Sequence, residues 1–535
     1  MHSTVQGLEI VVMLLLVSVV AFGWIANRLK TPYPIVLVIG GLALSLVPGI
    51  PRFSLEPDFV FLGVLPPLLF AAAFATSWRD FRYHLVSISF LAFGLVGFTV
   101  FAVAWAAQWM LPGFDWRLGL VLGAVVATTD AIAATSVAKR VGLPRRIIDI
   151  LEGESLINDA SGLLALEFAV AAVYSGQTPS LAQGVGRLLY LIVGGVAIGL
   201  VLGKVVHVVE KHIDHAPIEI TISLVTPFAA YLGAESIHSS GVLSAVACGL
   251  YLGRQSATYF SSVVRIEAWA VWNTLTFVLN GAVFILIGLQ LPYILGRIQG
   301  ISIPGLILRG AGFSLLIILL RLVWTYPGAW ASFFIRRKLL GQPESTPSSR
   351  GIFIVGWTGM RGVVALAAAI SLPTTISNGM PFPQRDVILF LTFCVIFVTL
   401  VLQGLTLPAL IRRLGLVQSN LAKCEVIEAR RIMIEAALSQ LEESPDRKEP
   451  EMMAIYEDVA GHYRTRLAAL NGVEQDSPEM SVEHDRFEHI SLQLRNAERA
   501  TAIELRDQER INDEVLRDLL HELDLLDARH DANHA

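Results

Sequence analysis

The chain has 535 residues, of which 54% are hydrophobic and 16% charged, and its mean hydropathy is +0.61. A soluble domain carries about 25% charged residues, so this composition excludes an ordinary soluble protein and indicates lipid as the main solvent. The charge is unevenly divided: residues 417–535 hold 14 Lys and Arg against 27 Asp and Glu, a net of −13, which leaves residues 1–416 with a net of +8. We therefore predict a membrane domain over residues 1–416 and an acidic cytoplasmic domain over residues 417–535.

Apolar runs long enough to cross a bilayer recur along the first domain, since a spanning helix needs about 20 apolar residues. The first run lacks a basic segment and a small-residue cleavage site, so we expect a retained helix rather than a signal peptide. The predicted spans lie near 8–29, 33–49, 58–77, 84–111, 117–138, 148–174, 185–209, 217–235, 239–254, 267–292, 304–334, 351–372 and 386–411. The sequence thus predicts an all-α polytopic membrane protein with about 13 transmembrane helices.

Basic residues occupy every second loop between these runs, and positive charge stays on the cytoplasmic side of a membrane. This alternation predicts an N-terminus outside and a C-terminal tail in the cytoplasm. The basic loops contain Arg28 and Lys30, Arg79 and Arg82, Lys139, Arg140, Arg145 and Arg146, Lys204 and Lys211, Arg254 and Arg265, Arg336 to Lys338 with Arg350, and Arg412 and Arg413.

An odd number of spans predicts one leading helix followed by two six-helix sets, spans two to seven and eight to thirteen, arranged as an inverted repeat. Spans five and twelve are assigned to equivalent positions, because both are interrupted by small and polar residues at 127–131 and 356–362. Irregular backbone is tolerated at membrane depth only where protein or water satisfies it. We therefore predict two discontinuous helices that cross at a binding site.

Charged residues inside the spans are few, and at the bilayer centre each costs at least about 2.5–3.5 kcal/mol. The densest group is Glu152-Gly-Glu-Ser-Leu-Ile-Asn-Asp-Ala160 in span six. On a helix Ser155 and Asp159 share a face, and Glu154 and Asn158 share the adjoining face. A hydroxyl, an amide and a carboxylate on one turn are the oxygen ligands that a small hard cation requires. Glu152 is expected at the cytoplasmic surface.

Arg361 in span twelve needs a partner, because an unpaired buried charge is costly. Glu154 is the predicted partner, in an ion pair that joins spans six and twelve. For Arg321 in span eleven, a local carbonyl contact and a structural ion pair both remain open.

These segments together resemble the cation/proton antiporter family one, which contains the NhaP-type bacterial Na+/H+ antiporters and the animal sodium/proton exchangers. Besides residues 152–160, the resemblance is carried by Ala127-Thr-Thr-Asp-Ala131, by Gly356 to Gly362 and by Leu65-Pro-Pro-Leu-Leu-Phe70. It covers about residues 10 to 415. Two positions depart from the pattern: Ala131 follows Thr-Asp where many relatives have proline, and Ala71 stands where several have glutamate.

The resemblance implies a homodimer in which a scaffold domain holds a six-helix core that moves as an elevator. It implies that Asp159 carries the cation or the proton, that Thr129 lends a backbone carbonyl and Ser155 a hydroxyl, and that Asp130 lies near the site. Asn158 fills the place where electrogenic relatives have a second aspartate. One carboxylate that holds either H+ or a cation, but not both, predicts electroneutral one-for-one exchange.

We therefore expect Na+/H+ antiport, with K+ or Li+ as the alternative ion and a membrane sensor or channel as the alternative class. An enzyme is not expected, since the spans contain no Ser/His pair and no metal-ligand spacing. The expected partners are the bilayer, monovalent cations and protons, with no cofactor and no nucleic acid. In the tail, residues 427–441 and 490–526 have helical periodicity, so a cytoplasmic helical regulatory domain is predicted.

Overall fold

The computed structural model describes residues 2–48, 56–175, 181–213, 215–298, 303–342, 346–377, 379–417 and 421–443, with short pieces between 456 and 468 and single positions at 498, 501, 508 and 525. The chain divides into two compact units, Met1–Gln418 and Ser419–Ala535. Across the described residues the regular structure is helical, and one isolated bridge joins Thr375 to Pro381.

The first half of the first unit runs from α1 to α9. The unit also contains three short π-helical turns, which are written η and continue the helices beside them. Two of these turns lie in this half. The elements are α1 (His2–Arg28), α2 (Tyr33–Ser45), η1 (Phe59–Val64), α3 (Leu65–Ala75), α4 (Trp78–Ser89), η2 (Phe90–Leu95), α5 (Val96–Met110), α6 (Trp116–Ala127), α7 (Ala131–Val141), α8 (Arg145–Ser175) and α9 (Leu181–Glu210).

The second half continues to the end of the unit, and one helix of the tail follows it. These elements are α10 (Ala216–Glu235), α11 (Gly241–Tyr259), α12 (Ser262–Leu289), α13 (Leu291–Arg297), α14 (Ile303–Lys338), α15 (Ser349–Trp357), α16 (Val363–Ile370), α17 (Arg385–Val398), η3 (Thr399–Gln403), α18 (Gly404–Arg413) and α19 (Leu421–Glu443).

Eight helical stretches among the described residues are long and apolar enough to cross a membrane, and three shorter apolar helices accompany them. A mostly helical, polytopic membrane architecture is therefore confirmed. In the tail, α19 contains the predicted helix 427–441, whereas most of 490–526 lies outside the described residues.

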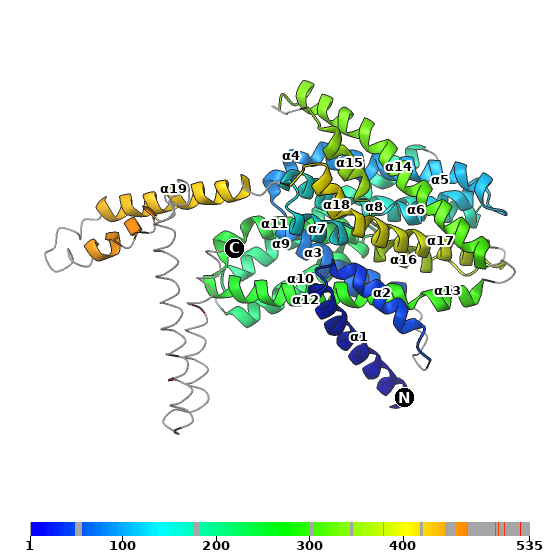
Figure 1. The fold of residues 1–535 in the computed structure, drawn as a ribbon, viewed down its shortest axis with the longest axis horizontal. Helices are drawn as coiled ribbons and strands as arrows, with labels where there is room; N and C mark the ends of the chain where they lie inside the picture. The colour runs from blue at the N-terminus through cyan, green and yellow to red at the C-terminus, as the bar shows by residue number, and fades with distance from the viewer. Residues whose placement is uncertain are drawn as a thin grey trace. The chain divides into compact units, whose positions relative to one another are not determined.

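The helices of the first unit pack mainly within two groups (Figure 1). The scaffold group consists of α1–α3 and α9–α13, and the core group consists of α4–α8 and α14–α18. Within the scaffold, α2 and α12 approach so closely that a Cβ on Gly41 or Gly288 would collide with the backbone of the other helix. Fewer contacts join one group to the other, and a cavity lies between them.

Candidate functional site

The first predicted interruption separates α6 from α7 at Thr128–Asp130. Thr128 is extended and buried, so the chain leaves the helix without reaching water. Asp130 then begins α7 as its N-cap, with its Oδ1 accepting the backbone N–H of Ile132 at 2.8 Å. Aspartate is among the preferred residues at this position because its side chain satisfies an unpaired helix donor.

The second predicted interruption separates α15 from α16 at Thr358–Gly362. The two breaks meet directly, since the backbone N–H of Asp130 donates to the carbonyl of Met360 at 2.8 Å. Gly362, the N-cap of α16, lies against Asp130 so closely that a Cβ there would collide with the carboxylate. Both interruptions are thus present and in contact.

Charged side chains at this crossing match the dipoles of the four half-helices. The Asp130 carboxylate lies at the N-termini of α7 and α16, where a helix carries partial positive charge. Arg361 donates from its Nε to the carbonyl of Val126, near the C-terminus of α6, at 3.2 Å, and from Nη1 to the carbonyl of Gly359 just beyond α15. A cation is favoured there because helix C-termini carry partial negative charge.

Helix α8 presents its polar turn to the α6–α7 break. Ser155 Oγ donates to the carbonyl of Thr129 at 3.2 Å and accepts the N–H of Ala131 at 3.2 Å. The side-chain amide of Asn158 donates to the same carbonyl at 3.2 Å and to Thr129 Oγ1 at 2.5 Å. The unwound backbone is therefore held in place by side chains of α8.

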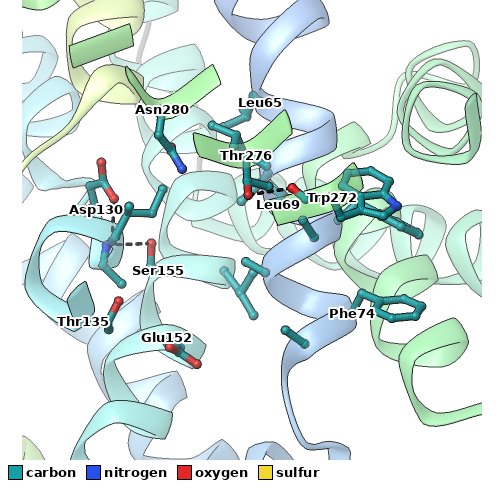
Figure 2. Close-up of a pocket in the computed structure, with 18 of the residues that line it drawn as sticks. Leu65, Leu69, Phe74, Asp130, Thr135, Glu152, Ser155, Trp272, Thr276 and Asn280 are labelled. Carbon is teal, nitrogen blue, oxygen red and sulfur yellow. Dashed lines mark hydrogen bonds between the residues drawn. The ribbon is translucent and has the colours of Figure 1, made fainter. Parts of the chain in front are cut away.

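A cavity of about 410 Å³ opens beside this network, and Figure 2 shows several of the residues that line it. Asp159, Ser155, Thr129 and Asp130 all border it. Asp159 is 5% exposed. A buried carboxylate beside hydroxyl and carbonyl oxygens can hold a proton or a small hard cation.

Asn158 differs from the other predicted ligands, because it does not border the cavity. It is fully buried and its amide holds Thr129, while its Oδ1 has no partner among the described residues. In this structure Asn158 positions Thr129.

The predicted ion pair between Glu154 and Arg361 is wrong. Arg321 of α14 holds both carboxylate oxygens of Glu154, with Nη1–Oε1 and Nη2–Oε2 distances of 2.5 and 2.7 Å. Arg321 also donates to the carbonyl of Val355 at 3.2–3.3 Å. Arg321 approaches the carboxylate edge on, so that two parallel hydrogen bonds can form. Arg361 is directed instead to the helix ends at the crossing.

Glu152 borders the cavity and forms an ion pair with Lys139 of α7 at 2.8 Å, with the two side chains 24% and 62% exposed. Arg265 of α12 lines the same cavity. Ala71 and Ala131 line it as well, so the two positions that depart from the family pattern present no side-chain oxygen.

Sequence reasoning missed the polar lining that α12 contributes. Asn273, Thr276 and Asn280 all border the cavity, and Thr135 of α7 does so too. The sequence did contain a signal for this lining. Thr276 and Asn280 follow Asn273 by three and seven residues in an otherwise apolar run, and this spacing places the three side chains on one helix face. No group of three or more His, Cys, Asp or Glu residues suited to a resident metal occurs in the described part of the chain.

Comparison with known proteins agrees with this architecture. A family model described as "Sodium/hydrogen exchanger, transmembrane" matches residues 14–413. An uncharacterised Na+/H+ exchanger of Mycobacterium tuberculosis is 31% identical over 525 residues, covering 96% of this chain and 95% of its own. A sodium, potassium, lithium and rubidium/H+ antiporter of Bacillus subtilis is 30% identical over 537 residues, covering 96% and 78%.

Among solved structures, the sodium proton antiporter MjNhaP1 of Methanocaldococcus jannaschii is similar in fold. The match has a TM-score of 0.60 at 21% identity and covers 76% of this chain and 98% of that one.

Proposed function

The chain belongs to the sodium/hydrogen exchanger family, a family of secondary transporters and not of enzymes, and on that basis we propose that it exchanges Na+ for H+ at Asp159. The observation that carries the proposal is the Asp159 carboxylate, which is 5% exposed and lies in a cavity that Ser155 and Thr129 also line. A bare carboxylate is costly inside a membrane. Neutralisation by H+ or by Na+ removes that cost, so the loaded site can move and the empty one cannot.

Cation binding at this site requires a change in the hydrogen bonds at Thr129. Its carbonyl accepts from both Ser155 and Asn158, so both of its lone pairs are occupied. Rotation of the Ser155 O–H away from that carbonyl frees one carbonyl lone pair. We infer that Na+ takes this place, with Asp159, the Thr129 carbonyl and Ser155 as ligands and with Asn158 as the group that holds Thr129.

The exchange is proposed to be electroneutral. Asp159 is the ionisable member of the Asn158–Asp159 pair, and Asp130 is engaged at the helix N-termini of the crossing. One proton therefore exchanges for one monovalent cation.

The movement is proposed to be of the elevator type, with the core group sliding against the scaffold group. The denser packing within each group and the cavity between them support this division. The ligands from α6, α7 and α8 all belong to the core group, so they travel together.

Thirteen spans are proposed for the unit, with a repeat that differs from the two six-helix sets expected above. The broken helices are spans five and twelve, which are seven apart, and neighbouring spans alternate in direction. An offset of seven reverses direction, whereas sets beginning at spans two and eight have an offset of six and would run parallel. Two six-helix sets with an offset of seven run over spans one to six and eight to thirteen, which places both broken helices fifth in their sets and leaves span seven between them.

The cavity is proposed to open to the cytoplasm of a bacterial inner membrane, with the N-terminus outside and the tail inside. Lys139 and Arg265, which line the cavity, lie near the ends of α7 and α12 that the positive charge assigns to the cytoplasm. Pairing of two chains as a homodimer, and regulation by residues 417–535, are proposed from the family resemblance.

A wider choice of ions follows from one particular observation. The Bacillus subtilis relative is described as acting on sodium, potassium, lithium and rubidium, which favours K+ and Li+ as additional substrates. A sensor or channel remains the alternative class.

Everted membrane vesicles test these proposals through the dequenching of a pH-sensitive dye. Na+, Li+ and K+ are added in turn over a range of pH values, and we expect Na+-dependent proton movement that Asp159→Asn abolishes. Proton flux without a cation on the opposite side would instead identify a channel.

A further inference from the structure

Helix α12 belongs to the scaffold group, yet one of its faces carries polar side chains into the transport cavity. Asn273, Thr276 and Asn280 line that cavity, at positions i, i+3 and i+7 of the helix. On the other wall Glu152, Ser155 and Asp159 of α8 line it with the same spacing. Figure 2 shows Asn280 and Thr276 projecting toward the space that Asp130 and Ser155 also border.

Asn280 is 8% exposed and lies deep in the helix, where an amide is costly unless it has polar partners. Asn280 borders the cavity, so its amide can be solvated there. The ring of Tyr33 of α2 packs on Phe277 of α12 at a centroid distance of 5.9 Å. Because α2 and α12 are in close backbone contact, Asn280 is held on a rigid support.

Thr276 presents an oxygen to the cavity for a different reason. Its hydroxyl hydrogen is used within the helix, with the carbonyls of Trp272 and Asn273 at 2.7 and 3.1 Å. The hydroxyl oxygen therefore retains lone pairs that can accept from water or face a cation.

Neutral amide and hydroxyl oxygens are ligands that hard cations accept, directly or through a retained water. We propose that Asn280, assisted by Thr276, forms the scaffold half of the cation site and supplies neutral oxygen ligation while Asp159 faces this cavity. This inference rests on the exchange function proposed above and adds a specificity-determining position to it.

The location of Asn280 on the scaffold has a consequence for sidedness. The ligands on α6, α7 and α8 move with the core, whereas Asn280 stays behind. It therefore stabilises the bound cation from one side of the membrane only. The apparent affinity for Na+ is higher on the side to which this cavity opens.

The inference is tested with the full-length protein by measuring KM and Vmax for Na+ in everted and in right-side-out vesicles. Asn280→Ala is expected to raise KM about tenfold in everted vesicles, because the variant loses about one favourable contact between the bound cation and the amide dipole. KM in right-side-out vesicles and Vmax are expected to stay unchanged. Asn280→Ser, which keeps a neutral oxygen, is expected to restore part of the affinity.

Thr274→Ala is the matched control, because Thr274 lies on the same helix, is exposed and bonds to the carbonyl of Ala270 outside the cavity. If Asn280→Ala does not fold, Thr276→Val tests the same face with little change in volume. An unchanged KM in the folded variants, or an equal rise on both sides, overturns the inference. Absence of Na+/H+ exchange in the unaltered protein overturns the proposed function instead, so the two failures are distinguishable.

Discussion

Arg321 and Glu154 form a bidentate ion pair that is almost completely buried, with the side chains 1% and 2% exposed. Oε1 of Glu154 also accepts the hydroxyl of Thr129 at 3.0 Å. The pair therefore connects α14 to α8 and, through Thr129, to the break that borders Asp159. Its position makes it a support for the site without being part of the cavity lining.

Removing one member of this pair is expected to destabilise the protein strongly. Arg321→Ala and Glu154→Ala each leave a buried charge without its partner, at a cost of about 3–5 kcal/mol. The thermal unfolding temperature in detergent measures the effect. Replacing both partners by Met and Gln is expected to cost less than the sum of the single changes, and additive losses would contradict a direct pair.

Gly362→Ala is expected to abolish or greatly reduce transport, because the added Cβ would collide with the Asp130 carboxylate. The collision displaces the group that lies at the N-termini of α7 and α16. Transport in vesicles and yield in the membrane are measured together. Gly97→Ala on α5 is the control, since a Cβ there meets nothing within 4 Å.

Asp159→Asn is expected to abolish exchange while the protein still folds and inserts, because the amide neither ionises nor exchanges a proton. Retained Na+-dependent proton flux in proteoliposomes would remove Asp159 from its proposed role. Asp159→Glu keeps the charge but moves it by one methylene, and we expect weakened rather than abolished transport.

Acidification is expected to raise KM for Na+ without lowering Vmax at saturating Na+, because protons and cations compete for one carboxylate. Once most sites are protonated, KM should rise about tenfold for each unit by which the pH falls. Initial rates over a pH series measure this slope. A hundredfold rise per unit would show that two protons compete with one cation.

Electroneutral exchange is expected to produce no current on a solid-supported membrane. Asn158→Asp adds a second acid beside Asp159 and removes the amide that holds Thr129. This variant is expected either to lose transport or to carry charge. A current in the unaltered protein that follows Na+ concentration would disprove one-for-one exchange.

Lys139→Ala is expected to lower KM for Na+ at low ionic strength, because Lys139 places positive charge at the cavity beside Glu152. The side chain is 62% exposed, so the effect should vanish in salt, where screening acts over about 10 Å at 0.1 M. Arg140→Ala is the control, since Arg140 is exposed but does not line the cavity.

The sequence alone was sufficient for the local features of this protein. Apolar runs identified the membrane helices because lipid requires them, and the spacing of Ser155 and Asp159 placed both on one face because a helix has 3.6 residues per turn. The Thr-Thr-Asp and Gly-rich segments indicated the two broken helices, since such residues disfavour continued helix and favour caps.

Tertiary structure alone decided which distant groups meet. Sequence reasoning chose Arg361 as the partner of Glu154, and only the tertiary structure, in which α14 packs on α15, brings Arg321 to Glu154 of α8. Likewise, their spacing places Asn273, Thr276 and Asn280 on one helix face, but nothing in the sequence says that this face borders the cavity, so Asn280 was missed. Pairing depends on how helices far apart in the chain are oriented about one another, and periodicity within a single helix carries no information about that orientation.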